Sequence, residues 1–344
     1  MNNMKILVIQ TAFIGDLIMT TPIFRALREV FPKAQIDALV IPQSAIILKY
    51  NPYIDNIYAF DKKSGFFRKI FNFFQIINRF RKEKYDIGIS VQSSYTSALI
   101  LLLSGIVRRI GYRRLPFATD KVLLPKGLHN RLRVLKLLEP LSNKTFTDST
   151  EIFLSEAEMS KAKEIIESCC NPENRKIAIA PGSVWETKKW SWEYYAELTK
   201  LLRSAKVDVF FIGSQQENEL CEKIISYAQN PNAFNFAGKL NLLESAALIA
   251  EMDLLICNDS SPLHIANAVG TDVFAFFGPT VRQFGCFPYR QNDKMLEVEL
   301  DCRPCSKHGG RRCPLGHHNC MKLIKPEYVY QLITEKFANS LPKT

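Results

Sequence analysis

Short apolar runs, four to six residues long and rich in β-branched or aromatic side chains, recur along the chain. They are Lys5–Ile9, Ile36–Val40, Ile87–Val91, Ile177–Ala180, Val207–Ile212, Leu254–Cys257 and Val273–Phe277. Apolar runs of this length are typical of parallel strands that are buried on both faces of a sheet. We therefore predict a core built from parallel sheet.

Helical periodicity fills the intervals between these strands. The predicted helices are Asp16–Val30, Thr96–Leu103, Ser191–Ser204, Glu217–Gln229 and Leu243–Glu251. This alternation predicts an α/β protein with doubly wound sheets. At 344 residues the chain is too long for one compact core, so we predict two Rossmann-like domains. A predicted helix at Ser155–Cys170 ends at Asn171–Pro172, which marks the end of the first domain. We therefore place the two domains at residues 1–170 and 176–325, with a linker at about 168–176.

The composition is that of a globular protein, with 47% hydrophobic and 23% charged residues. The longest apolar stretch, around Ala98–Leu103, is closed by Ser104 and Gly105 and falls short of the ~18 residues that a membrane span needs. Asp16 interrupts any apolar region that would resemble a secretion signal. We therefore expect a soluble protein of the cytosol.

The net charge of +11 is concentrated in the first half, where residues 1–170 carry 25 Lys and Arg against 15 Asp and Glu. Between residues 62 and 84 basic residues alternate with aromatic ones: Lys62, Lys63, Phe66, Phe67, Arg68, Lys69, Phe71, Phe73, Phe74, Arg79, Arg81, Lys82 and Lys84. Such a patch favours a polyanion or an anionic membrane surface as partner. The alternative is a solvated helix face that packs on its phenylalanine side.

The turn after the first strand, Thr11–Asp16, places Asp16 at the carboxyl end of the sheet, where α/β proteins bind ligands. Asp16 is either a helix N-cap or a general base. The turn holds one glycine, Gly15, instead of the Gly-x-Gly-x-x-Gly that a dinucleotide fold requires.

The loop from Ala180 to Ser191 combines hydroxyl donors at Ser183 and Thr187 with charge at Lys188 and Lys189. This set is suited to a diphosphate, and the alternative is an irregular connection with exposed lysines. Glu217, four residues past Gly213, either accepts from ribose hydroxyls or favours the positive end of the following helix.

The segment Asn258–Ala268 reads as a buried strand that breaks into a helix with Pro262 in its first turn. The free N–H groups of that turn predict a phosphate site. Asp259 would repel phosphate, so we assign it to orienting the loop or to a sugar hydroxyl. His264 either donates to the anion or packs, and Gly278–Thr280 should line the same pocket.

Cysteines and histidines are dense near the C-terminus: Cys302, Cys305, His308, Cys313, His317, His318 and Cys320. The density is typical of a zinc site, but a second Cys-x-x-Cys is missing. A metal site, a disulfide and reduced thiols all stay open.

Taken together, the Ile-Gly-Asp turn, Pro-Gly-Ser-x-Trp-x-Thr-Lys-x-Trp at 181–190, Asn-Asp-Ser-Ser-Pro-Leu-His at 258–264 and Gly-Pro-Thr at 278–280 resemble the heptosyltransferases of glycosyltransferase family nine. The resemblance covers nearly the whole chain. Residues 313–321, Cys-Pro-Leu-Gly-His-His-Asn-Cys-Met, are most similar to the branch that adds the second heptose of the lipopolysaccharide inner core, heptosyltransferase II.

The resemblance implies a GT-B fold, in which an acceptor domain (1–170) and a donor domain (176–325) face a central cleft and a C-terminal helix (326–344) packs on the first domain. It implies inverting transfer without a metal or other cofactor. By position, Asp16 matches the catalytic base, Ser183 and Lys188 match donor-phosphate ligands, and Leu240 matches the adenine contact. The donor-site turn corresponds to Asp259, Ser260, Ser261 and His264. Relatives often carry Thr-Gly at the 260–261 pair, and some carry another hydroxyl at Val184.

The expected reaction moves L-glycero-D-manno-heptose from ADP-heptose to heptosyl-Kdo-lipid A. The acceptor is an anionic lipid-linked saccharide, for which we assign Lys62, Lys63, Arg68, Arg113 and Arg114. A monomer at the cytoplasmic face of the inner membrane, with no nucleic acid partner, is expected. Alternatives are another donor or core position, an epimerase or hydrolase acting on a sugar nucleotide, and a non-catalytic protein that binds a sugar nucleotide or an anionic lipid.

Overall fold

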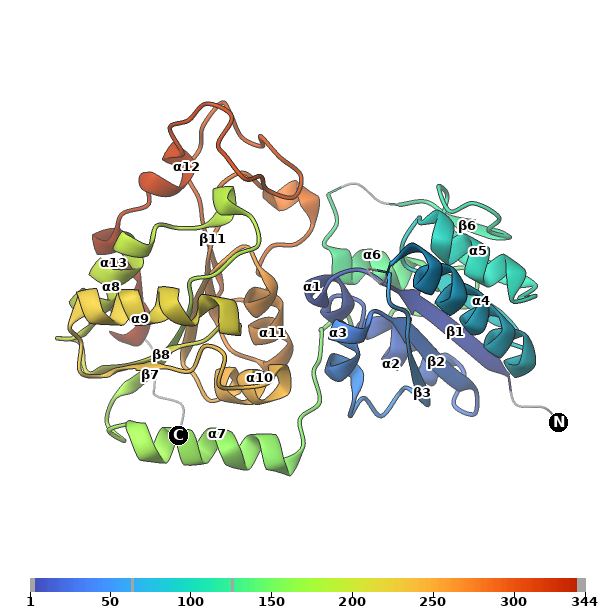
Figure 1. The fold of residues 1–344 in the computed structure, drawn as a ribbon, viewed down its shortest axis with the longest axis horizontal. Coiled ribbons are helices and arrows are strands. Elements are labelled where there is room, and N and C mark those ends of the chain that lie inside the picture. Colours follow the sequence, from blue (N-terminus) through green and yellow to red (C-terminus); the bar gives the residue numbers. More distant parts are fainter. Residues whose placement is uncertain (1–3, 63–64, 125–126, 339–344) are drawn as a thin grey trace. The chain divides into compact units, whose positions relative to one another are not determined.

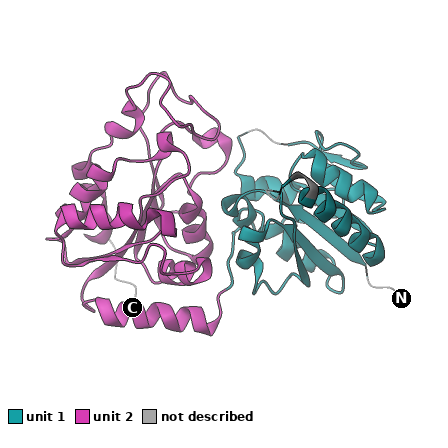
Figure 2. Cartoon of the chain, in the orientation of Figure 1, with its two compact units in different colours: residues 1–153 teal, residues 154–344 magenta. Residues whose placement is uncertain are grey.

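The computed structural model describes residues 4–62, 65–124 and 127–338. The chain divides into two compact units, Met1–Phe153 and Leu154–Thr344, which Figure 2 distinguishes by colour. Each unit contains one six-stranded sheet whose strand pairs are parallel. Lys63, from the predicted acceptor patch, lies outside the described residues.

The sheet of unit 1 has the order β3-β2-β1-β4-β5-β6. Its strands are β1 (Lys5–Gln10), β2 (Gln35–Val40), β3 (Asn56–Ala59), β4 (Ile87–Ser90), β5 (Arg108–Tyr112) and β6 (Asp120–Val122). The chain builds outward from β1 in one direction and then from β4 in the other. The switch point of this doubly wound sheet therefore lies between β1 and β4, where ligands bind at the carboxyl ends of such strands.

The helices of unit 1 are α1 (Ile14–Ile18), α2 (Pro22–Val30), α3 (Pro42–Ala45), η1 (Ile46–Leu48), α4 (Phe66–Glu83), α5 (Tyr95–Leu103) and α6 (Asn130–Lys136) (Figure 1). Leu7 and Ile9 of β1 pack in one cluster with Phe80 of α4 and Leu101 of α5. Side chains alternate along a strand, so Ile6 and Val8 point to the opposite face, where they too are fully buried. Burial on both faces is why the strand reads as a continuous apolar run.

The predicted helix over residues 16–30 is two helices, α1 and α2, separated by a turn. Pro22 occupies the first position of α2, where the backbone N–H would have no partner in the helix. Because proline has no N–H to donate to the preceding turn, α1 cannot continue through it into α2. The Thr21 hydroxyl donates to the carbonyl of Ile18 and accepts from the backbone N–H of Glu151, which fixes the turn.

The sheet of unit 2 has the order β12-β11-β10-β7-β8-β9. Its strands are β7 (Arg175–Ala180), β8 (Val207–Phe211), β9 (Ala233–Asn235), β10 (Leu254–Asn258), β11 (Val273–Phe276) and β12 (Lys294–Leu296). The chain reverses its direction of growth between β7 and β10. The loops that follow these two strands therefore meet at the second switch point.

The helices of unit 2 are α7 (Glu156–Cys169), η2 (Glu186–Lys188), α8 (Trp192–Leu202), η3 (Gln215–Glu217), α9 (Asn218–Ala228), α10 (Leu242–Ala250), α11 (Ser261–Val269), η4 (Arg282–Phe284), α12 (Asn319–Lys322) and α13 (Pro326–Ala338). Trp190 anchors the core on one face of the sheet. Its ring stacks on Phe276 at 4.2 Å between centroids, and its indole N–H donates to the carbonyl of Ile324. The core thus ties β11 to the start of α13.

The unit boundary lies earlier than the linker that we predicted. Helix α7 belongs to unit 2 because it packs on α10, to which Lys161 adds an ion pair with Glu244 at 2.7 Å. Helix α13 packs on α8, and Val329 and Ile333 join the core of unit 2. Its expected packing on the first domain stays a prediction. Throughout the described residues, no helix is both long enough and apolar enough to cross a bilayer.

Candidate active site

A pocket of about 400 Å³ opens at the switch point of unit 2. Five residues predicted to contact a nucleotide sugar line it together: Ser183, Glu217, Leu240, Ser260 and Ser261. They come from the loops after β7, β8, β9 and β10. The lining combines apolar side chains, among them Leu240, Leu242 and Ile249, with hydroxyl groups and the start of α11. An apolar pocket with a few converging polar groups is the usual form of a nucleotide site.

The helix start in this pocket is that of α11. Ser260 takes the extended N-cap conformation, with φ −152° and ψ 178°, and Pro262 lies in the first turn. The unpaired N–H groups of that turn and the positive end of the helix dipole attract an anion. Ser260, Ser261 and Pro262 line the pocket, so a phosphate in it would meet these groups.

Glu217 enters the pocket from the turn between β8 and α9. Its carboxylate accepts from the backbone N–H of Ser214 at 2.6 Å and from the Ser214 hydroxyl at 2.9 Å. A Cβ built on Gly182 would lie 1.4 Å from its Oε1 atom. A side chain at position 182 would therefore displace the Glu217 carboxylate, which caps its own turn and lines the pocket.

Lys188 forms a buried ion pair with Asp259, with 2.6 Å between Nζ and Oδ2. The same carboxylate oxygen accepts from the hydroxyl of Thr280 at 2.7 Å. Thr280 is in turn held by Arg303, whose guanidinium donates to the Thr280 carbonyl. Within the part of the chain that is described, Lys188, Asp259 and Thr280 are not in the lining of the pocket. Their contacts fix the loop that precedes α11.

His264 is buried beside this pair. Burial, followed by the positive charge of Lys188, lowers the pKa of His264 to about 3. Its imidazole is therefore neutral at physiological pH. Any hydrogen bond that His264 gives to an anion comes from a neutral ring.

Thr187 has a role other than the predicted diphosphate contact. Its hydroxyl accepts from the backbone N–H of Gly310 at 2.8 Å and donates to the Gly310 carbonyl at 3.1 Å. His318 approaches the Thr187 carbonyl with its Nε2 atom at 2.8 Å. Thr187 is buried and ties the cysteine-containing loop to η2.

Sequence reasoning assigned no role to Asn258, which the structure places at the centre of the site. Its side-chain amide donates to the carbonyls of Pro181 and Gly182 at 2.8 and 3.2 Å. Its side-chain oxygen accepts from the backbone N–H of Trp190 at 2.9 Å and from the Tyr195 hydroxyl at 3.1 Å. This fully buried residue thus joins the end of β10 to the loop after β7, and the residues that follow each of these strands line the pocket.

Unit 1 has a pocket of about 220 Å³ at its own switch point, and Asp16 lines it. Phe13 occupies the N-cap position of α1, so Asp16 lies in the first turn and is not the cap. The polar lining beside it consists of Gln10, Thr20, Gln92, Ser93, Tyr112, Asn130 and Arg133. A carboxylate among hydroxyl and amide groups at this edge is placed to take a proton from a bound hydroxyl.

Among the described residues, the predicted acceptor cations Lys62, Arg68, Arg113 and Arg114 are not in the lining of the Asp16 pocket. Arg68 is exposed on α4, and Arg113 and Arg114 are exposed after β5. Lys62 is half-buried, and this burial, followed by the charge of Lys69, lowers its pKa. The Asp16 pocket contains instead a cation that we did not assign, Arg133, whose guanidinium donates to the side chain of Asn130 at 2.9 Å.

The cysteines near the C-terminus are free thiols in the structure: Cys302, Cys305, Cys313 and Cys320. Burial raises the pKa of Cys320 to about 11, which favours its protonated form. No three His, Cys, Asp or Glu side chains are grouped to hold a metal ion in the part of the chain that is described.

Two doubly wound parallel-sheet units, each with a pocket at its switch point, have the architecture of the GT-B fold of sugar-nucleotide transferases. The family model described as glycosyltransferase family 9 (heptosyltransferase) matches residues 73–315, and the chain belongs to this family. It is therefore a glycosyltransferase of the heptosyltransferase class.

Curated relatives of similar length support this membership. Lipooligosaccharide heptosyltransferase 2 of Campylobacter jejuni is 26% identical, and the match covers 98% of this chain and 99% of the relative. Lipopolysaccharide heptosyltransferase 3 of Escherichia coli K12 is 28% identical over 78% of this chain and 81% of its own length. The structure of E. coli ADP-heptose lipopolysaccharide heptosyltransferase II superposes with a TM-score of 0.78, at 23% identity over 98% of this chain and 99% of the other.

Proposed function

We propose that this protein transfers L-glycero-D-manno-heptose from ADP-heptose to heptosyl-Kdo-lipid A, with inversion of the anomeric centre. The observation that carries the proposal is the pocket of unit 2, whose lining brings together apolar side chains, the Glu217 carboxylate and the start of α11, the groups that a nucleoside diphosphate requires. The similarity to lipooligosaccharide heptosyltransferase 2 over nearly the whole chain supports the donor and acceptor class.

In this proposal the adenine packs on Leu240, Glu217 accepts from the ribose hydroxyls, and the diphosphate lies between Ser183 and the start of α11. Lys188, which approaches the Asp259 carbonyl at 3.3 Å as well as its carboxylate, supplies positive charge behind that helix start. Fixed dipoles and a cation that face the leaving diphosphate stabilise the charge that it gains in the transition state. We propose that these groups do so without a metal or other cofactor.

Asp16 is the proposed general base. It takes the proton from the acceptor hydroxyl while the hydroxyl oxygen attacks the anomeric carbon from the face opposite ADP. One displacement forms the new glycosidic bond and breaks the bond to the diphosphate, which inverts the centre. We propose that the enzyme acts as a monomer at the cytoplasmic face of the inner membrane, where its lipid-linked acceptor lies.

The test is to incubate the purified protein with ADP-heptose and lipopolysaccharide truncated at successive core positions, and to weigh the products. One added heptose on the acceptor that ends in the first heptose is expected. Transfer only to a longer core would assign the enzyme to a later heptose, which its similarity to lipopolysaccharide heptosyltransferase 3 favours as the second candidate. Release of ADP or heptose without an acceptor would overturn the proposal in favour of a hydrolase.

Gly182→Ala is expected to weaken ADP-heptose binding by about tenfold, the value of one hydrogen bond to a charged group. The new Cβ would lie 1.4 Å from Oε1 of Glu217 and must displace its carboxylate from the pocket. Glu217→Ala should weaken binding to a similar extent, and the double variant no further, because both changes remove one interaction. Calorimetric titration measures all three. The control is Gly65→Ala, where a Cβ meets nothing within 4 Å; unchanged binding by Glu217→Ala would remove the ribose contact.

His264→Gln is expected to reduce the loss of stability on acidification. The folded-state pKa of His264, about 3, lies below the unfolded value of about 6.5, so protons bind the unfolded chain preferentially. Stability from the neutral imidazole is complete above pH 6.5 and is lost as the pH falls toward 3. Urea unfolding at pH 7.5 to 4.5 should show a smaller decline in the variant than in the wild type. Exposed His308→Gln serves as control, and an identical decline in His264→Gln would contradict the buried, neutral assignment.

A further inference from the structure

Helix α4 (Phe66–Glu83) presents apolar side chains on two faces. Ile76, Ile77 and Phe80 are buried against the sheet of unit 1, and Phe73 packs beside them. These contacts are sufficient to hold the helix in place. Apolar residues on any other face of α4 therefore need a different explanation.

The outer face of α4 exposes Ile70, Phe71 and Phe74, with exposed fractions of 40%, 66% and 55%. Phe71 and Phe74 line an open apolar groove of about 420 Å³ with Gln75, Asn78, Arg79 and Lys82. A single exposed phenylalanine is ordinary, but a contiguous apolar group on one helix face marks an interaction surface.

The charges around this groove are positive. Arg68 and Lys82 are exposed on α4, and within the described residues neither of them forms an ion pair with a carboxylate. Glu83, the one acid of the helix, is paired with Lys5 at 2.8 Å. The cations of the outer face are thus available to anionic groups outside the protein.

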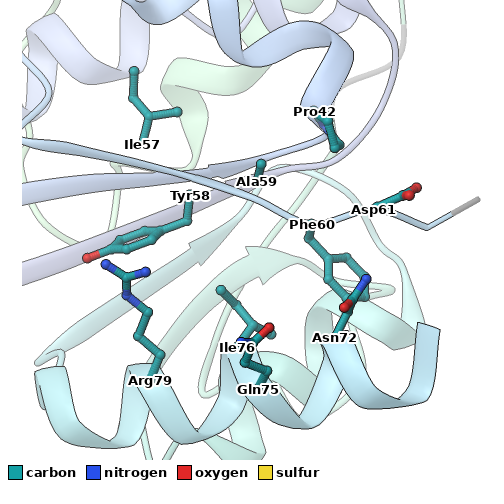
Figure 3. A pocket seen from close by; sticks show the side chains of 10 residues that line it. All are labelled: Pro42, Ile57, Tyr58, Ala59, Phe60, Asp61, Asn72, Gln75, Ile76 and Arg79. Carbon is teal, nitrogen blue, oxygen red and sulfur yellow. The ribbon is translucent and has the colours of Figure 1, made fainter. Parts of the chain in front are cut away.

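A polar pocket of about 340 Å³ adjoins the groove and shares Gln75 and Arg79 with it. Figure 3 shows Arg79 projecting from α4 toward the Tyr58 ring, with Asn72 and Gln75 on the same helix and Asp61 also in the lining. The Arg79 guanidinium lies 4.4 Å from the centroid of the Tyr58 ring. The amides and the guanidinium offer donors to oxygen atoms of a polar head group, whereas Asp61 disfavours more than one negative charge.

We propose that the outer face of α4 docks on an anionic lipid bilayer. Phe71 and Phe74 enter the boundary between head groups and acyl chains, Arg68 and Lys82 contact lipid phosphates, and Arg79 with Gln75 and Asn72 takes one head group. A basic helix with exposed aromatic residues is the form of an interfacial membrane helix, and its charge complements anionic lipids. The inference rests on the proposed function, because the lipid-linked acceptor of that reaction lies in such a bilayer.

Sedimentation of the full-length protein with vesicles tests the docking. The protein should pellet with phosphatidylcholine vesicles that contain about 30% phosphatidylglycerol, and less with phosphatidylcholine alone. Phe71→Ser/Phe74→Ser should lower the partition coefficient at least about tenfold, and Lys82→Glu about fivefold or more. The controls are Val107→Ser, which changes a 79%-exposed residue elsewhere in unit 1, and Lys33→Glu, which reverses an exposed charge before β2.

Phe71→Trp provides a direct readout of insertion. The native tryptophans, Trp185, Trp190 and Trp192, all belong to unit 2, so their signal forms a constant background. The new indole should shift to shorter wavelength on addition of phosphatidylglycerol vesicles and be quenched by brominated acyl chains. An indole that stays water-exposed in vesicle-bound protein would overturn the assignment of α4.

Two other outcomes would also overturn it. Vesicle binding by Phe71→Ser/Phe74→Ser equal to that of the wild type would place any membrane contact elsewhere. A wild-type dimer that the same double change dissociates, with no binding to vesicles, would make the face an interface between copies. Failure of the proposed function is distinguishable, because vesicle binding is measured without donor or acceptor. If both proposals hold, the double variant transfers heptose normally to a delipidated acceptor and slowly to an acceptor embedded in vesicles.

Discussion

Asp16→Asn is expected to lower the single-turnover rate of heptose transfer by about 10²–10⁴-fold, the usual contribution of a general base. The amide has the shape of the carboxylate but cannot take the proton of the acceptor hydroxyl. Asp16 lies in the first turn of α1, where a negative charge near the helix start contributes about 1 kcal/mol or less to stability. Rapid-quench measurements with saturating ADP-heptose isolate the chemical step.

Glu156→Gln is the matched control for this variant. Glu156 is an exposed carboxylate in the first turn of α7, so the same exchange is made at another helix start, outside both pockets. Its rate should equal that of the wild type. A rate for Asp16→Asn within about tenfold of the wild type would exclude Asp16 as the base.

Lys188→Ala is expected to destabilise unit 2 by about 3–5 kcal/mol, because it leaves the buried Asp259 carboxylate without its cation. Urea unfolding followed by tryptophan fluorescence reports on this unit, which contains Trp185, Trp190 and Trp192. Donor binding and transfer should fall as well, since the positive charge behind the α11 start is removed.

Lys189→Ala is the matched control for Lys188→Ala. Lys189 pairs with Glu186 at the surface, where an ion pair contributes about 0–1 kcal/mol, so its loss should have little effect.

A second change separates the structural role of Lys188 from its role in transfer. Asp259→Asn in the Lys188→Ala background removes the unpaired buried charge and should restore stability. Transfer should stay low in that double variant if Lys188 stabilises the diphosphate. Restored transfer would reduce Lys188 to a structural residue.

The core strands are predictable from the sequence because burial on both faces requires uninterrupted apolar runs. All seven predicted strands are confirmed, as β1, β2, β4, β7, β8, β10 and β11. The strands that we did not predict are β3, β5, β6, β9 and β12. They are short or polar, as in Asp120–Val122 and Lys294–Leu296, because strands nearer the edges of a sheet bury less of their surface. Their pairing depends on the neighbouring strand and leaves little local signal.

A pocket residue can be predicted from the sequence when its place in a loop after a core strand is enough to bring it to the pocket. Ser183, Glu217 and Ser260 follow strands whose ends must meet, so the sequence alone brings them together. Thr187 could not be judged in the same way, because its hydroxyl is used by Gly310, far along the chain. The hydrogen bonds of Asn258 could not be predicted for the same reason, since its partners Pro181 and Tyr195 become its neighbours only in the fold.

Asn258 also bears on how the family can change its substrates. The frame of the donor pocket is set by one fully buried amide whose bonds are all to the core and the loop backbones. The rim, by contrast, contains side chains such as Val184, which is 87% exposed. Under the proposed function, a substitution at the exposed rim would change which sugar the pocket admits, whereas the buried Asn258 would keep the loops behind it in place. Sugar preference would then be able to diverge among relatives that share one fold.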